Sequence, residues 1–265
     1  MSLVNEIRHA YQSDGIVQLG LLAVGFVYNR TVWPVLPEAD EFQHFNGIRR
    51  RRKKILDGTV PFPTRTSEEK TGYEENLASP IREYINSGET VIEVAAGFGI
   101  CSVIVAEQVG PEGEIITYEG SANRAAEAAQ VVKYNNVADR AKVRHAVLQT
   151  ARTEDTRSVR LEGQMRGATA VSIGDLPDAD TFVIDCDGCE LELLDHLDEL
   201  PDKLILEHHA VLDTETTVAY DPNGVREKLV DAGYDIQFEG ETPMPGMLPQ
   251  FGTEETVFVA ERSDG

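Results

Sequence analysis

Short apolar segments with the character of strands alternate with helical segments from Glu89 onward in this sequence. The predicted strands cover residues 90–94, 114–118, 141–146, 181–184 and 203–206, and the predicted helices cover 100–109, 123–134, 191–197 and 223–232. A strand followed by a helix, repeated several times, is typical of a parallel sheet with helices on both faces. The alternation therefore predicts an α/β fold.

The end of the chain departs from this alternation. Residues 234–239 and 256–261 are both strand-like, but Pro243, Pro245 and Pro249 between them disfavour a crossover helix. Two strands joined without such a helix are expected to pair antiparallel. We therefore predict a Rossmann-like sheet of seven strands, mostly parallel, with an antiparallel C-terminal hairpin.

The first predicted strand contains Glu93 and runs into a turn of small residues, Ala95-Ala96-Gly97-Phe98-Gly99. Small residues at alternate positions leave room for a ligand against the backbone, and the next helix directs its N-terminus at the same place. Glu119 ends the second predicted strand 20 residues after Gly99, where an acidic side chain can accept the ribose hydroxyls of an adenosine. Both NAD and S-adenosylmethionine fit this pattern.

The third glycine position of a dinucleotide fingerprint is occupied by Ser102. A pyrophosphate needs close approach to the backbone at the start of the helix, whereas a methionine sulfonium does not. The turn therefore favours S-adenosylmethionine, and an NAD-dependent oxidoreductase is the alternative.

A second group of polar residues follows the fourth and fifth predicted strands. Asp185 and Asp187 come after the fourth strand, and Glu207, His208 and His209 come after the fifth. Ligands of open α/β sheets bind at this carboxyl edge, and a histidine there can take the proton of an attacking hydroxyl. One alternative is a pair of ordinary loop histidines. Another is a divalent ion on Asp185, Asp187, Glu207 and His208, but we predict no metal site.

These motifs resemble those of the FkbM-type methyltransferases, a class I family that uses S-adenosylmethionine. The resemblance spans about residues 71–261, and its most specific part is 184–191, where Asp185, Gly188 and Glu190 are in register with an Ile-Asp-Val-Glu-Gly-Ala-Glu-like motif. The resemblance implies that Asp185 lies beside the methionine end of the cofactor and that the segment with Tyr73 and Glu74 folds over it. The cofactor-binding residues that it implies are Tyr73, Glu74, Glu93, Ala95, Gly97, Gly99, Glu119, Gly120 and Asp185.

Three positions depart from the family pattern. Val183 replaces a lysine, Asp187 replaces a glutamate, and Gly120 replaces a proline. We expect cofactor binding to persist, whereas the charge and reach of side chains near the acceptor are altered. The predicted catalytic residues, as candidates for the base, are Asp187, His208 and His209.

Acidic residues outnumber basic ones by 46 to 24, which gives a formal net charge of −22. Such a chain repels phosphate backbones, so we expect no nucleic-acid partner. Because lysine is scarce and carboxylates dominate, the composition suits the cytoplasm of a halophilic cell, where salt screens self-repulsion. An ordinary acidic protein is the alternative.

The three cysteines do not suggest a disulfide framework. Cys186 and Cys189 have the spacing of a redox or zinc pair, but we interpret them as small packing residues in a reducing cytoplasm. The apolar segment 15–28 is shorter than the roughly 20 residues that span a bilayer, and no signal peptide precedes it. We predict a buried helix there.

Residues 1–87 show no strand alternation, and we predict a mainly helical N-terminal extension before a methyltransferase domain at 88–265. The basic run at 49–54 is interpreted as a solvated helix face, with a clamp for an anionic acceptor as the alternative.

The combined expectation is a cytoplasmic methyltransferase that acts on an oxygen of a small molecule or sugar. Its partner is a small-molecule acceptor, without nucleic acid or an integral membrane segment, and a homo-oligomer is left open. A methyltransferase-like scaffold without catalysis is the non-enzymatic alternative.

Overall fold

The structure is a computed structural model of the 265-residue chain. It describes residues 38–53, 69–70, 72–149, 167–186, 189–209, 211–212, 217–218, 221–243 and 254–262. The chain divides into two compact units, Met1–Tyr73 with Thr214–Thr216, and Glu74–Asp213 with Thr217–Gly265.

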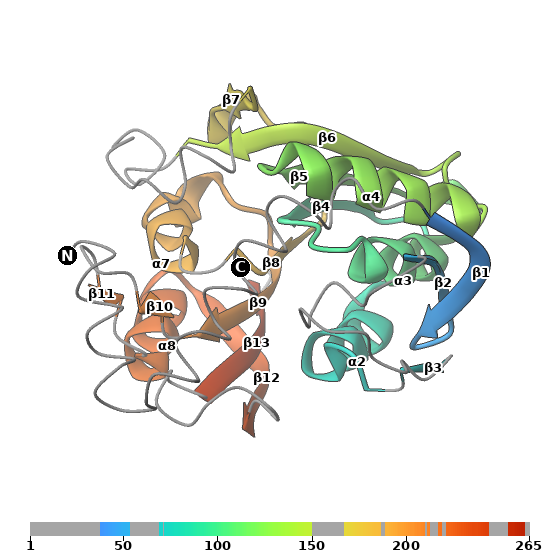
Figure 1. The fold of residues 1–265 in the computed structure, drawn as a ribbon. Helices are drawn as coiled ribbons and strands as arrows, with labels where there is room; N and C mark the ends of the chain where they lie inside the picture. Colours follow the sequence, from blue (N-terminus) through green and yellow to red (C-terminus); the bar gives the residue numbers. More distant parts are fainter. Residues whose placement is uncertain are drawn as a thin grey trace, which may run out of the picture. The chain divides into compact units, whose positions relative to one another are not determined.

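The second unit contains a sheet with the strand order β12-β13-β9-β8-β4-β5-β6-β7 (Figure 1). Its strands are β4 Thr90–Val94, β5 Glu114–Glu119, β6 Ala141–Leu148, β7 Thr169–Val171, β8 Thr181–Ile184, β9 Lys203–His209, β12 Tyr234–Pro243 and β13 Glu254–Arg262. β13 pairs antiparallel with both β9 and β12, and the pairs from β9 to β7 are parallel. The predicted mostly parallel sheet with a C-terminal antiparallel hairpin is confirmed, and β7 adds an eighth strand.

Helices cover both faces of this sheet (Figure 1). One face carries α2 Glu75–Tyr84, α3 Ile100–Val109 and α4 Ala122–Tyr134, and the other carries α7 Glu190–Leu193, η5 Leu194–Glu199 and α8 Pro222–Asp231. The short helices η3 Gly110–Glu112 and η4 Ile173–Asp175 and the paired strands β10 Val211–Leu212 and β11 Thr217–Val218 complete the described elements of this unit. The predicted layers of helix, sheet and helix are therefore present.

The helix after the first strand of the sheet is buried on nearly all sides. Eight of the ten residues of α3 are buried, because α2 and α4 flank the helix and the sheet lies beneath it. This explains its sequence, which has no polar face of the kind that a surface helix shows. The N-terminus of α3 is thereby fixed at the carboxyl edge of β4.

The first unit contains a small sheet where we expected helix. β1 Glu38–Phe45 and β2 Ile48–Lys53 form an antiparallel hairpin, and β3 Glu69–Lys70 pairs parallel with β1. Asn46 and Gly47, with φ of 50° and 84°, form the two-residue turn between β1 and β2. The structure thus differs from the predicted helical extension at these residues, and the predicted helix at 15–28 lies outside the described ranges.

The interpretation of the basic run as a solvated helix face is wrong. Its residues as far as Lys53 belong to β2, and the Arg50 side chain is 5% exposed, with its guanidinium 5.4 Å from the ring centroid of Phe45. Stacking on an aromatic ring lets an arginine be buried at moderate cost. Arg50 is therefore part of the packing of the first unit.

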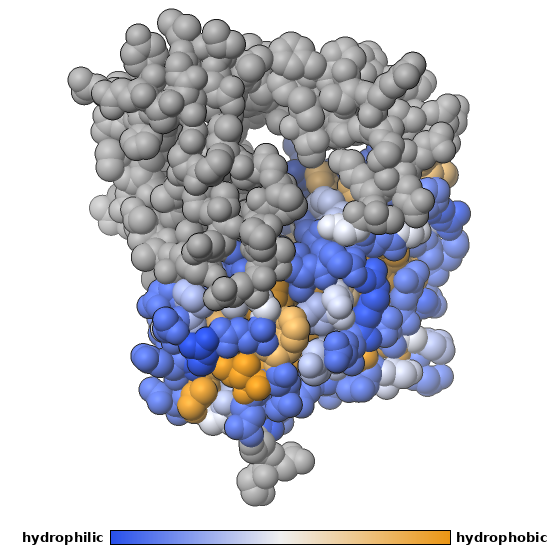
Figure 2. Space-filling view, turned by 90° about the horizontal axis from the view of Figure 1, so that it is seen from below, coloured by the Kyte–Doolittle hydropathy of each residue, from blue (hydrophilic) through white to orange (hydrophobic). Residues whose placement is uncertain are grey.

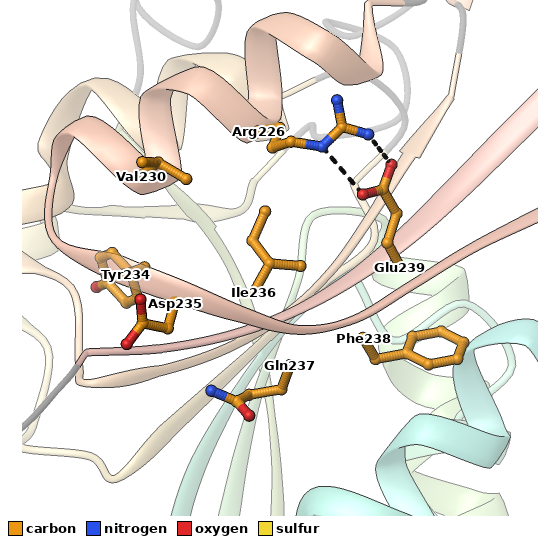
Figure 3. Close-up of a pocket in the computed structure, with 8 residues that line it drawn as sticks. All are labelled: Arg226, Val230, Tyr234, Asp235, Ile236, Gln237, Phe238 and Glu239. Atoms are coloured by element: carbon orange, nitrogen blue, oxygen red, sulfur yellow. Dashed lines mark hydrogen bonds and ion pairs between the residues drawn. The ribbon is translucent and has the colours of Figure 1, made fainter.

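The outer edge of the large sheet carries a groove of about 410 Å³ between β12 and α8 (Figure 3). Its lining residues are Arg226, Val230, Tyr234, Asp235, Ile236, Gln237, Phe238 and Glu239. Val230, 55% exposed, is the one exposed large hydrophobic side chain among the described residues, and Figure 2 shows an apolar patch on a mainly hydrophilic face. Because β13, β9 and β8 separate β12 from β4, this groove is distinct from the turn that follows β4.

Candidate functional site

The turn between β4 and α3, residues 95–99, is called the glycine turn here. Ala95, Gly97 and Gly99 all have left-handed backbones, with φ of 68°, 52° and 78°. The Ala95 N–H donates to the Tyr118 carbonyl at 2.9 Å, and the Gly99 N–H donates to the Ala96 carbonyl at 2.7 Å. The turn is therefore closed on itself and tied to β5.

The two glycines of this turn have different surroundings. A Cβ at Gly99 would lie 2.8 Å from the Cα of Ala128, so this glycine allows α4 to pack against the turn. A Cβ at Gly97 would have no atom within 4 Å, so its backbone faces open space. Gly97 thus has the geometry of a position where a ligand contacts the backbone, and Gly99 has that of a packing position.

Glu119 ends β5 beside the glycine turn, and its carboxylate joins two loops. Oε2 accepts the N–H groups of Ala96 at 3.0 Å and Gly97 at 3.3 Å, and Oε1 accepts the N–H of Ser121 at 2.7 Å. Burial raises the pKa of Glu119, although these three donors and the nearby Arg124 act in the opposite direction. The predicted pair of glycine turn and acidic residue is therefore brought together in space.

Glu93 lies beneath the turn and is 2% exposed. Its carboxylate accepts hydrogen bonds from the hydroxyls of Ser102 on α3 and Thr117 on β5. Burial raises its pKa to about 7 against the effect of these donors. Glu93 therefore supports the turn from below, and Ser102 is the residue that links α3 to it.

A group of carboxyl groups extends from this turn along the carboxyl edge of the sheet. Asp185 follows β8, Glu207 lies in β9, and Glu255 lies in β13. The Asn76 side chain on α2 donates to Glu207 at 3.3 Å and to Glu255 at 2.6 Å. Burial, followed by the charges of Asp185, Glu255 and Glu74, raises the pKa of Glu207 well above its usual range.

Asn76 and Glu255 were not predicted as site residues. Asn76 lies 131 residues from Glu207 and 179 residues from Glu255 in the sequence, so no local motif joins the three.

The two residues of the predicted cofactor-covering segment belong to different units. Tyr73 is in the first unit, where its N–H donates to the Asn46 side chain at 3.0 Å and its ring packs edge-on against Phe45. Glu74 precedes α2 in the second unit and accepts a hydrogen bond from the Cys101 thiol at 3.6 Å. Glu74 is thereby placed near the glycine turn.

Of the three predicted catalytic residues, only His208 has a side chain that the structure describes. Asp187 and the side chain of His209 lie outside the described part of the chain. His208 is not a loop residue, since it lies in β9 and is fully buried, and its Nε2 accepts the Asp221 N–H at 3.1 Å. β9 extends through both histidines because β13 pairs with them.

Gly120 lies between the site and β6. Its carbonyl is 3.1 Å from Nε2 of His145, a hydrogen bond that requires the proton on this nitrogen. His145 is opposite Glu119 in the parallel pair of β5 and β6. The loop after Glu119 is therefore held at Gly120 as well as at Ser121.

Cys186 and Cys189 pack against the hydrophobic core as predicted, but they are also linked to each other, which was not predicted. A disulfide joins them directly after Asp185, with 5.5 Å between their Cα atoms. Within the described residues, no group of three or more His, Cys, Asp or Glu side chains has the arrangement to hold a metal ion. No helix of the described ranges has the length and apolar character needed to cross a membrane.

Comparison with protein-family models and with curated proteins gives no match to this sequence. Solved structures with a similar fold include a SAM-dependent methyltransferase from Aquifex aeolicus, with 14% identity and a TM-score of 0.45 over 72% of this chain and 93% of that one. A SAM-dependent O-methyltransferase from Thermotoga maritima has 15% identity and a TM-score of 0.44 over 73% and 67%. M. jannaschii TYW2 in complex with AdoMet has 13% identity and a TM-score of 0.47 over 82% and 84%.

Proposed function

We propose that this chain is an S-adenosylmethionine-dependent methyltransferase that holds its cofactor over the glycine turn. The observation that carries the proposal is the hydrogen bonding of Glu119 to the amides of Ala96 and Gly97. A carboxylate has about four acceptor positions, and three of those on Glu119 are used by backbone N–H groups. One position on Oε1 is left for a ribose hydroxyl, next to the open backbone of Gly97.

The charges around the site support a cationic cofactor. Burial raises the pKa of the Cys101 thiol, and the nearby carboxylates of Glu74 and Asp185 raise it further. The sulfonium and ammonium groups of S-adenosylmethionine are attracted to such surroundings, whereas the pyrophosphate of NAD is repelled. Ser102 adds to this preference, because it occupies the third glycine position of a dinucleotide fingerprint and its hydroxyl is already bonded to Glu93.

The bound cofactor supplies a methyl group that is already activated for displacement. In the proposed reaction, Glu119 and the glycine turn hold the adenosine, Asp185 lies beside the methionine end, and the acceptor oxygen is aligned at the same edge of the sheet. Asp187 and His209 are the proposed proton acceptors. His208 is the weaker candidate, since its Nε2 already accepts the Asp221 N–H.

The proposed acceptor is a hydroxyl of a small molecule or sugar. The net charge of −22 opposes binding of RNA or DNA, whose phosphates need basic partners. The proposed setting is the cytoplasm of a cell with high internal salt, which the excess of carboxylates supports.

Isothermal titration tests the cofactor assignment with S-adenosylmethionine, its demethylated product and NAD, in high salt. We expect the first two to bind and NAD not to bind. Glu119→Gln should weaken binding roughly 10- to 100-fold, as expected for the loss of a charge-assisted hydrogen bond. The matched control is Glu107→Gln on the exposed side of α3, which removes the same charge and should leave binding unchanged.

Absence of binding by both S-adenosylmethionine and its product would refute the proposal. Binding of NAD alone would favour an oxidoreductase. If Glu119→Gln bound the cofactor as tightly as the unchanged protein does, the proposed role of Glu119 would be refuted. The assignment of S-adenosylmethionine as the cofactor would still hold.

A further inference from the structure

The disulfide between Cys186 and Cys189 lies within the candidate site. Cys186 directly follows Asp185, whose N–H donates to the Val94 carbonyl of β4 at 3.3 Å. Cys189 directly precedes α7, and its carbonyl accepts the N–H of Leu193 at 3.0 Å. The bridge therefore connects the end of β8 covalently to the start of α7.

A single side chain provides a second link across the same gap. Oε1 of Glu190, the first residue of α7, accepts the N–H of Cys186 at 3.2 Å, and Glu190 is fully buried. With the disulfide closed, the backbone beside Asp185 is held by one covalent and one hydrogen-bonded connection to α7. When the disulfide is reduced, only the hydrogen-bonded one of these two connections remains.

The short loop that this disulfide closes indicates that its main role is not to stabilise the fold. The stability that a disulfide gives by restricting the unfolded chain grows with the length of the loop, and this loop has two intervening residues. Both cysteines are half-buried, whereas Cys101 is buried. A Cys-x-x-C pair that solvent can reach is typical of thiols that are oxidised and reduced reversibly.

We propose that Cys186 and Cys189 form a reversible dithiol–disulfide pair that controls cofactor binding through Asp185. The inference rests on the proposed function, because Asp185 is assigned there to the methionine end of the cofactor. In the disulfide state the Asp185 carboxylate is held in place and the cofactor binds more tightly. In the dithiol state its position is less restricted and the cofactor binds more weakly.

The reductant is a dithiol, either a small molecule or a dithiol protein. Its thiolate attacks one sulfur of the Cys186–Cys189 bond, the bond breaks, and a mixed disulfide forms. The second thiol of the reductant then displaces the remaining protein sulfur. Two electrons and two protons pass to the protein, which gains two thiols, and the reductant becomes a cyclic or intramolecular disulfide.

The test uses the full chain in two states, one kept oxidised and one treated with excess dithiothreitol. Alkylation under denaturing conditions followed by mass spectrometry counts free thiols, and we expect one in the oxidised state and three in the reduced state. S-adenosylmethionine is then titrated into both, and we expect reduction to weaken binding five- to tenfold. Cys101→Ala should keep this difference.

The double variant Cys186→Ser/Cys189→Ser is the critical comparison. It should bind S-adenosylmethionine with the weaker affinity in both conditions, because it has no bridge. Three free thiols in the oxidised protein, equal affinity in the two states, or a double variant that still responds to dithiothreitol would each overturn the proposal. Failure of the proposed function is recognised separately, since neither state would then bind the cofactor although the thiol count still changed.

Discussion

The Glu93 carboxylate accepts a hydrogen bond from the Thr117 hydroxyl, with 2.7 Å between the two oxygens, beneath the glycine turn. The two residues are register partners in β4 and β5. Ser102 on α3 donates to the same carboxylate oxygen. One buried side chain thus joins two strands and a helix at the place where the proposed cofactor would lie.

Glu93→Gln should change how stability depends on pH. Burial raises the pKa of Glu93 from 4.5 to about 7, so the folded protein holds this proton more tightly than the unfolded chain. The resulting stability is complete below about pH 4.5 and is lost as the pH rises to about 7. Relative to Glu93→Gln, the unchanged protein should lose on the order of 3 kcal/mol of unfolding free energy between pH 4.5 and 8.

Urea denaturation of both proteins at several pH values measures this difference. Other groups, such as Glu207, contribute to the pH dependence of stability in both proteins, so the difference between the two curves reports on Glu93. Parallel stability curves for the two proteins would show that Glu93 does not titrate in this range.

The sequence pattern predicted the sheet well because its strands are buried and short. β4, β8 and α3 have the predicted bounds, since each is an apolar run ended by residues that change the local conformation. Helix α2 falls within the segment that was predicted to be mainly helical, but its bounds were not predicted, and Pro80 inside it disfavours a helix locally. The hairpin of β1 and β2 was missed, although Asn46-Gly47 is a strong signal for such a turn.

The candidate site was predictable only where it is local in sequence. The glycine turn and Glu119 follow from spacing along two adjoining strands, and the structure brings them together. The bonds of Asn76 to Glu207 and Glu255 depend on how α2 packs on β9 and β13, which no local pattern specifies. The end of β9 was placed too early for the same reason, since β13 supplies the partners of its last residues.

Gly97→Ala and Gly99→Ala should separate binding from stability. An alanine at either position has the cost of a left-handed backbone, roughly 1–2 kcal/mol. At Gly99 the new methyl group also meets Ala128 at 2.8 Å, so the total loss should be about 2–4 kcal/mol. At Gly97 it meets nothing, and we expect a smaller loss of stability but clearly weaker binding of S-adenosylmethionine.

Chemical denaturation and cofactor titration on both variants give the comparison. Equal losses of stability would mean that α4 moves freely to accommodate Gly99→Ala. Unchanged binding in Gly97→Ala would place the cofactor away from this backbone.

Ala95→Gly should stabilise the protein. Ala95 has a φ of 68°, which glycine adopts without the cost that a Cβ imposes. The greater freedom of glycine in the unfolded chain offsets part of this, which leaves a gain of up to about 1 kcal/mol. The neighbouring Ala96→Gly is the control, because its backbone is not left-handed, and it should destabilise by about 0.5–1 kcal/mol. A loss of stability in Ala95→Gly would contradict the prediction.

Asn76→Ala should destabilise the protein because it removes an amide donor to two buried carboxyl groups. The Asn76 amide bonds to Glu207 and Glu255, which are both 6% exposed, so water replaces it poorly. Loss of a donor to a buried acceptor costs roughly 1–3 kcal/mol. Asn86→Ala is the matched control, since it removes an amide that donates to Glu89 at 2.7 Å in an exposed position and should cost less than about 0.5 kcal/mol. Urea denaturation at pH 7 compares the two variants, and similar losses would mean that Glu207 and Glu255 satisfy each other without α2.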